Sequence, residues 1–120
     1  EQRPDKIDHE FIQQHSAFFE DYQHSVTHTS WDKIEQQSGL TKAEIIQAAT
    51  VFSDSKTVIS CWAMGLTQHK HSVDIIREVV NLHLLCGQIG KKGAGLCPVR
   101  GHSNVQGNRT MGINEKPSPA

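Results

Sequence analysis

The chain has 120 residues and a formal net charge of −1 at pH 7, from 12 Lys and Arg against 13 Asp and Glu. This length predicts one domain at most, with a modest core. The near-neutral charge argues against nucleic acid or a membrane surface as a partner. No apolar run approaches the length of a membrane span, and the first residues do not resemble a signal peptide.

The cysteines and the two ends of the chain bear on its compartment and completeness. Cys61, Cys86 and Cys97 form no C-x-x-C pair, so we expect small buried hydrophobes or reduced thiols of a cytoplasmic protein. The chain lacks an initiator Met and ends in Lys-Pro-Ser-Pro-Ala. We therefore expect it to be an internal fragment of a longer protein.

Residues 1–55 are predicted to be mainly helical. Apolar residues recur near the helical period over residues 7–23, and either Asp5 or Asp8 can cap this helix. Residues 24–29 are polar and β-branched, which predicts a connection. The first helix is therefore expected to end near residue 23.

Two further helices follow, with clear boundary signals. Ser30 is placed to cap a short helix that Gly39 ends. Thr41 and Glu44 have the spacing of a capping box, in which each side chain binds the other residue's free backbone amide. This box opens a helix that we expect to run through Phe52.

The second half of the chain contains the only convincing strand. Residues 57–63 are almost continuously apolar, as in strands that are buried on both faces of a parallel sheet. A loop over residues 64–69 is expected at its carboxyl end. Residues 72–86 form the strongest predicted helix, which should be buried on most sides and end at Gly87.

A single strand raises the question of where its backbone hydrogen bonds go. The partner could be a second strand in the glycine-rich segment, sequence outside this chain or another subunit, and we favour sequence outside the chain. We predict an α/β fold: a predominantly helical fragment with one buried strand, part of a larger Rossmann-like parallel α/β domain. It would form a single partial domain over residues 1–120, with a helical part (1–55), a strand, helix and glycine-rich loop (56–112) and a tail (113–120). Such a fragment could self-associate.

The loop after the strand carries candidate binding groups. In open parallel sheets, ligands bind beyond the carboxyl ends of the strands, where residues 64–69 are expected. Gly65 would allow a close approach there, and Thr67 and Gln68 offer hydrogen bonds. An ordinary solvated loop is an equal alternative.

The glycine-rich segment carries a second group of polar side chains. Arg100 follows an apolar Cys-Pro-Val stretch, and its guanidinium is suited to hold a carboxylate or phosphate. His102, Asn104 and Gln106 add further hydrogen-bonding groups. The alternative is a solvated surface loop in which Arg100 forms an ion pair.

Two apparent motifs are weak. The glycine series from Gly87 to Gly95 follows a helix, whereas a dinucleotide-binding fingerprint must follow a strand. The eight histidines have no recognised metal-ligand spacing. We therefore predict no metal ligand in this chain.

A series of short motifs resembles a known family. Their order and spacing over roughly residues 57–112 resemble the molybdopterin oxidoreductase family, specifically its formate dehydrogenase alpha-subunit-like branch. Trp31, Gly39 and the pair Ala48-Ala49 extend the resemblance into the first half. The motifs are Trp62–His69, Asn81-Leu82, Gly87–Gly90, Gly93–Gly95, Pro98–Gly101 and Asn104–Gly107.

The resemblance implies part of a catalytic subunit that binds molybdenum through two molybdopterin guanine dinucleotides. Such an enzyme moves two electrons between the metal and a small anionic or polar substrate, while the protein supplies orientation and electrostatics. The metal-ligating residue and any iron–sulfur cluster would belong to an earlier region outside this chain. The isolated fragment would be inactive, because it needs the remainder of its own subunit. The electron acceptor stays open.

The resemblance also assigns roles to individual residues. Arg100 would lie in the substrate pocket and orient a small anion such as formate. The residues expected to contact the pterin cofactor are Met64, Gly65, Thr67, Gln68, Asn104 and Gln106. His102 is a departure, because the formate dehydrogenase branch usually has an amide there. An imidazole beside the substrate arginine changes its charge and reach, so the resemblance does not extend to formate itself.

Two alternatives to a catalytic subunit remain at this point. The chain could be a non-catalytic ligand-binding or interaction module that retains the family fold. It could also belong to a regulatory relative that binds the cofactor without turnover.

Overall fold

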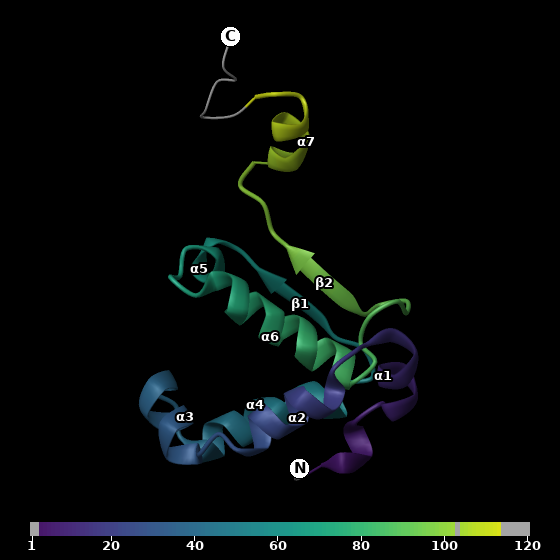
Figure 1. Cartoon of the computed structure of the whole chain (residues 1–120), viewed down its shortest axis with the longest axis vertical. Coiled ribbons are helices and arrows are strands. Elements are labelled where there is room, and N and C mark those ends of the chain that lie inside the picture. Colours follow the sequence, from purple (N-terminus) through teal and green to yellow (C-terminus); the bar gives the residue numbers. More distant parts are fainter. Residues whose placement is uncertain (1–2, 103, 114–120) are drawn as a thin grey trace.

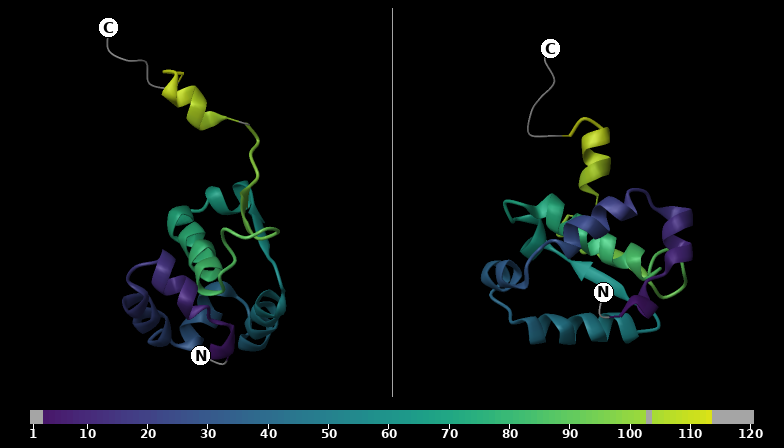
Figure 2. Two further views of the ribbon diagram at one scale, coloured as in Figure 1. Left: turned by 90° about the vertical axis from the view of Figure 1, so that its right-hand side faces the viewer. Right: turned by 60° about the horizontal axis from the view of Figure 1, so that its bottom comes forward.

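The computed structural model describes residues 3–102 and 104–113. The α6 helix packs along one face of a two-stranded sheet, the other long helices lie at one end, and α7 projects from the opposite end (Figures 1 and 2). The elements in chain order are a 3₁₀ turn (Pro4–Lys6), α1 (His9–His15), α2 (Phe19–Thr27), α3 (Trp31–Ser38), α4 (Lys42–Asp54), β1 (Ile59–Trp62), α5 (Met64–Thr67), α6 (Ser72–Leu85), β2 (Gly95–Pro98) and α7 (Val105–Thr110).

Strand β1 has a partner within the chain. β2 runs parallel to it, with Ile59 opposite Gly95 and Trp62 opposite Pro98. The pairing continues just outside the strands, where the Val99 N–H donates to the Trp62 carbonyl at 2.7 Å. The preference for a partner outside the chain was therefore wrong for this edge of β1. The partner lies in the glycine-rich segment, where Gly93 has a φ of +83°, a left-handed turn that suits glycine.

The prediction that β1 is buried on both faces was also wrong for this chain. Ile59 is 55% exposed and Cys61 is exposed, whereas Ser60 and Trp62 on the other face are half-buried. The physical reason is that α6 covers one face of the sheet only. The α/β character of a mostly helical chain is confirmed, while the larger Rossmann-like domain stays a prediction.

The first predicted helix is in fact two helices. Asp8 is the N-cap of α1, where its side chain accepts the Phe11 N–H at 3.0 Å. The chain then breaks at Phe18, which has a left-handed φ of 60°. The polar connection expected over residues 24–29 begins later, because α2 continues to Thr27.

The other helix boundaries agree with the sequence signals. Ser30 caps α3, and Gly39 ends it with a φ of 71°. Thr41 and Glu44 form the predicted capping box at the start of α4. Gly87 follows α6 with a φ of +55°. None of the described helices is long and apolar enough to cross a membrane.

Helix α6 is less buried than expected, and its most buried residue is polar. Val73 is 61% exposed and Leu82 is 40% exposed, whereas His83 is 0% exposed. The prediction of burial on most sides was therefore wrong in this chain. Helix α6 contacts the sheet, α1 and α5, and it also meets α2 and α4 through side chains, but the positions between these contacts are open to solvent.

A cluster of the buried His83 and Gln88 with the half-buried Ser60, which we call the His83 node, joins α6 to β1. His83 Nε2 lies 2.6 Å from Ser60 Oγ, and His83 Nδ1 lies 3.1 Å from the Gln88 carbonyl oxygen. A carbonyl can only accept, so Nδ1 carries the proton, and in a neutral ring Nε2 then accepts from the Ser60 hydroxyl. Gln88 Oε1 in turn accepts the Val58 N–H at 3.1 Å. These bonds fix β1 on α6.

Candidate functional site

The carboxyl ends of the two strands meet at the same edge of the sheet, because β1 and β2 are parallel. β1 leads into α5, and β2 leads into the segment that connects to α7. Between these segments and α6 lies a cleft of about 460 Å³, which we call the strand-end cleft. Its lining residues are Trp62, Ala63, Met64, Thr67, Ile76, Pro98, Val99, Arg100, Gly101, His102 and Val105.

The strand-end cleft brings together four of the predicted site residues from two distant parts of the sequence. Met64 and Thr67 come from α5, and Arg100 and His102 come from the segment after β2. The in-register pairing of Trp62 with Pro98 sets this arrangement, since each strand enters its loop at the same level. Two loops that were predicted separately therefore share one cleft.

The other four predicted residues do not line the cleft. Gly65 is in α5 and has open space around it, and Gln68 at the end of α5 is exposed. Gln106 is exposed on α7. Asn104 is the N-cap of α7, where its Oδ1 accepts the Gly107 N–H at 3.1 Å.

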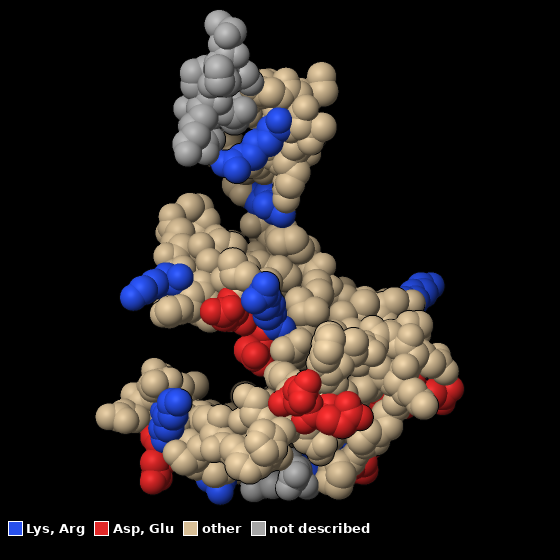
Figure 3. All heavy atoms as spheres, in the orientation of Figure 1, with Lys and Arg blue, Asp and Glu red and all other residues tan. Residues whose placement is uncertain are grey.

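The charge around the strand-end cleft favours an anion. No carboxylate side chain lines it, and the sequence has no Asp or Glu between residues 79 and 114. On the face drawn in Figure 3, the projecting part of the molecule shows basic but no acidic side chains. Arg100 is exposed and forms no hydrogen bond or ion pair with any described residue. The ion pair considered for Arg100 is thus not formed among the described residues.

The apolar part of the lining was not predicted from the sequence. Trp62, Ile76 and Val105 contribute it from the end of β1, from α6 and from α7. The sequence did not mark these residues as part of a binding site, because Ile76 and Val105 look like ordinary core positions of helices. The wall is therefore mixed, with apolar side chains beside one guanidinium, one imidazole and one hydroxyl.

The histidines do not gather into a metal site among the described residues. Within the described residues, no group of three or more His, Cys, Asp or Glu side chains could hold a metal ion. His24 on α2 and His28, the residue after α2, have their ring centroids 3.9 Å apart, and both are exposed. His83, by contrast, is engaged in the buried node.

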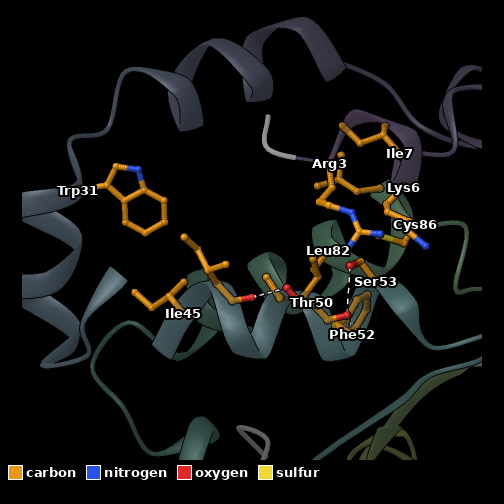
Figure 4. A pocket seen from close by; sticks show the side chains of 13 residues that line it. Arg3, Lys6, Ile7, Trp31, Ile45, Thr50, Phe52, Ser53, Leu82 and Cys86 are labelled. Atoms are coloured by element: carbon orange, nitrogen blue, oxygen red, sulfur yellow. Dashed lines mark hydrogen bonds between the residues drawn. The ribbon is translucent and has the colours of Figure 1, made fainter. Parts of the chain in front are cut away.

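A second cleft of about 280 Å³ lies between α4, α6 and the N-terminal turn (Figure 4). Its walls are mostly apolar and include Ile45, Phe52 and Leu82. The cations at its end, Arg3 and Lys6, are 2.9 and 3.0 Å from Asp54 Oδ1. Because this carboxylate already pairs with both cations, the second cleft offers a ligand less charge than the strand-end cleft.

Comparison with known proteins gives a consistent picture. The sequence profile described as "Molybdopterin oxidoreductase" matches residues 9–118. Protein YdeP of Escherichia coli K12 is 47% identical over 116 residues, which cover 97% of this chain and 15% of YdeP. A nitrate reductase of Synechocystis is 38% identical over 106 residues, 88% of this chain and 15% of that protein. Formate dehydrogenase H of E. coli K12 is 36% identical over 105 residues, again 88% and 15%. The chain thus spans about 15% of the length of these relatives.

Proposed function

Because this chain belongs to the molybdopterin oxidoreductase family, we propose that its strand-end cleft is one wall of the site for a molybdenum–pterin cofactor and a small substrate. The intact protein would be a formate dehydrogenase-like oxidoreductase that binds two molybdopterin guanine dinucleotides. The observation that carries this proposal is the shared cleft: Met64 and Thr67 lie on one side, and Arg100 and His102 on the other.

The residues of the cleft fit a bulky, anionic, heteroaromatic group. Its apolar side chains can lie against a flat ring, and Thr67 can hydrogen-bond to ring heteroatoms. Arg100 can hold a phosphate or carboxylate, and no carboxylate of the lining would repel one. Gly65 has open space on its Cα side, so a ligand can approach the α5 backbone closely.

The cofactor, when bound, supplies the two-electron chemistry. The side chains of this chain would bind and orient. Arg100 would hold an anionic or polar substrate, and His102 would donate to or accept from it. Met64, Thr67 and the neighbouring Gly65 and Gln68 would contact the pterin. Asn104 and Gln106 would complete the wall once α7 is packed against the rest of the subunit.

The substrate is a separate proposal. Two relatives carry the names of different substrates, formate and nitrate, and both substrates are small anions. We propose a substrate of this class, with the choice among them influenced by His102. We also propose a cytoplasmic protein whose electron acceptor, and any iron–sulfur cluster, engage parts of the polypeptide beyond these residues.

Metal and pterin analysis of the intact protein tests this proposal. We expect molybdenum and pterin to co-purify with the protein in a fixed ratio, and oxidoreductase activity to require both. A fully active preparation without molybdenum would contradict the proposal. A protein that holds pterin and molybdenum but oxidises or reduces none of the small anions would instead favour a regulatory relative. A protein that binds neither would favour a non-catalytic interaction module.

A further inference from the structure

The face of the sheet opposite α6 carries two cysteines side by side. Cys61 on β1 is opposite Cys97 on β2 in the strand register, and both are free and exposed. Residues directly opposite on adjacent strands point to the same face of a sheet. Ser60, one residue before Cys61, contacts α6 through His83. The two thiols therefore lie on the face away from α6, and neither lines the strand-end cleft.

The two thiols interact with each other. The pKa of the Cys61 thiol is raised above its usual value, first by partial loss of the solvent around it and then by the neighbouring Cys97 side chain. A metal ion that binds this pair displaces the protons of the two thiols, as soft metal ions do.

The strand spacing is compatible with a two-coordinate ion. Adjacent strands lie about 4.8 Å apart. Metal–sulfur bonds are a little over about 2 Å long, so a linear sulfur–metal–sulfur unit spans roughly 4.5 Å. The same spacing is within the Cα separation that a disulfide bridges, about 4.4 to 6.8 Å, so the site is proposed for the reduced thiols, and both cysteines are free. Within the described residues no third His, Cys, Asp or Glu completes a larger ligand set, which disfavours a four-coordinate ion such as Zn²⁺.

We propose that Cys61 and Cys97 form a two-thiolate site for a soft monovalent cation, with Cu(I) as the probe. Thiolates are the ligands that select Cu(I) among the biological metals. Binding forms two copper–sulfur bonds, breaks two S–H bonds and releases two protons to solvent, with no change in the oxidation state of copper or sulfur. The site is independent of the cofactor proposal, because it uses the opposite face of the sheet.

Anaerobic titration of the reduced intact protein with Cu(I), against a chromophoric Cu(I) chelator, tests the site. We expect Cys61→Ser or Cys97→Ser to weaken binding by about 100-fold or more, because the second bond of the pair is intramolecular. Cys86→Ser is the matched control: Cys86 is half-buried after α6, and its loss should leave the affinity unchanged. An equal loss in the control, unchanged affinity in both single variants, or Zn²⁺ bound as tightly as Cu(I) would overturn the proposal.

Alkylation of the unsubstituted protein tests the site without any variant. Cys61 and Cys97 should both react with iodoacetamide in the native apo protein, and one equivalent of Cu(I) should protect them together while Cys86 is unaffected. Mass spectrometry of the peptides reports each site. If the two thiols do not react in the native protein, or if copper protects only one of them, the proposed site is wrong.

Discussion

The two ends of β1 use polar groups in opposite ways. At the start of the strand, every ring nitrogen of His83 has a partner in the His83 node, and the side chain is 0% exposed. At the end of the strand, Arg100 and His102 are exposed and bond to no described residue. Polar groups that satisfy one another stabilise a fold, whereas polar groups without partners are available to a ligand.

This contrast predicts a separation of effects. Substitutions in the His83 node should change the free energy of unfolding, and substitutions in the strand-end cleft should change cofactor content or turnover. A substitution that affects both would show that the two ends of β1 are coupled through the strand itself.

The largest effect is expected for His83→Ala. It removes a buried ring that Phe52 contacts edge-on, with a centroid distance of 5.2 Å, and it leaves Ser60 and the Gln88 carbonyl without their partner. Cavity formation and the lost hydrogen bonds together should lower the free energy of unfolding by about 3 kcal/mol. Urea unfolding followed by tryptophan fluorescence measures this.

The control for His83→Ala is His69→Ala, at an exposed position. A surface change of this kind should stay within about 0.5 kcal/mol of the unsubstituted protein. Equal destabilisation by the two substitutions would mean that the His83 node has no special role in stability.

Arg100→Ala should have the next largest effect, and this effect should be on turnover rather than on the free energy of unfolding. Loss of a guanidinium that holds an anion should lower turnover with any accepted substrate by about 100-fold, with unfolding unchanged. Arg100→Lys should recover part of the activity, because it keeps the charge but not the forked geometry.

The matched control is Arg77→Ala, which removes an exposed arginine on α6 that is 3.5 Å from Asp74. Exposed pairs of this type contribute little, so activity should be retained. Unchanged turnover in Arg100→Ala would favour the non-catalytic alternative for the cleft.

The features that could be predicted from the sequence are those set by residues close together in the chain. Ser30, Thr41 and Gly87 mark helix ends through interactions within a few residues, and the structure confirms each of them. The shared family motifs pointed to the two loops of the cleft. A cap or a turn needs no knowledge of distant residues.

The parts that could not be predicted depend on distant pairing. Strand β2 contains a glycine and a proline, so its composition is poor for a strand, and only its pairing with β1 defines it. His83 is one of eight histidines in the sequence, and nothing nearby marks it as buried. Its partner Ser60 is 23 residues away, and the fold alone brings the two together.

Gly87 and Gly90 test how closely the turn after α6 is packed. Both have left-handed φ angles, +55° and +77°, but a Cβ at Gly87 would meet the Asp8 carboxylate, whereas Gly90 has open space. Gly90→Ala should cost about 1 kcal/mol from the backbone alone. Gly87→Ala should cost about 2 kcal/mol, because Asp8 must also move from its capping position at α1. Thermal or urea unfolding of the two variants measures the difference, and equal losses would show that Asp8 moves freely.

The smallest effect is expected for Asn104. Its side chain already caps α7, so it could serve the stability of the fold as well as the binding of a ligand. Asn104→Ser keeps a capping oxygen but removes the amide that we propose contacts the cofactor. Since one neutral hydrogen bond contributes about 1 kcal/mol, pterin retention by the intact protein should fall about fivefold, with Asn108→Ser in the same helix as the control. If Asn104→Ser retains the pterin fully while Asn104→Ala does not, Asn104 acts only through the helix cap. It would then belong with His83, as a polar group used within the fold.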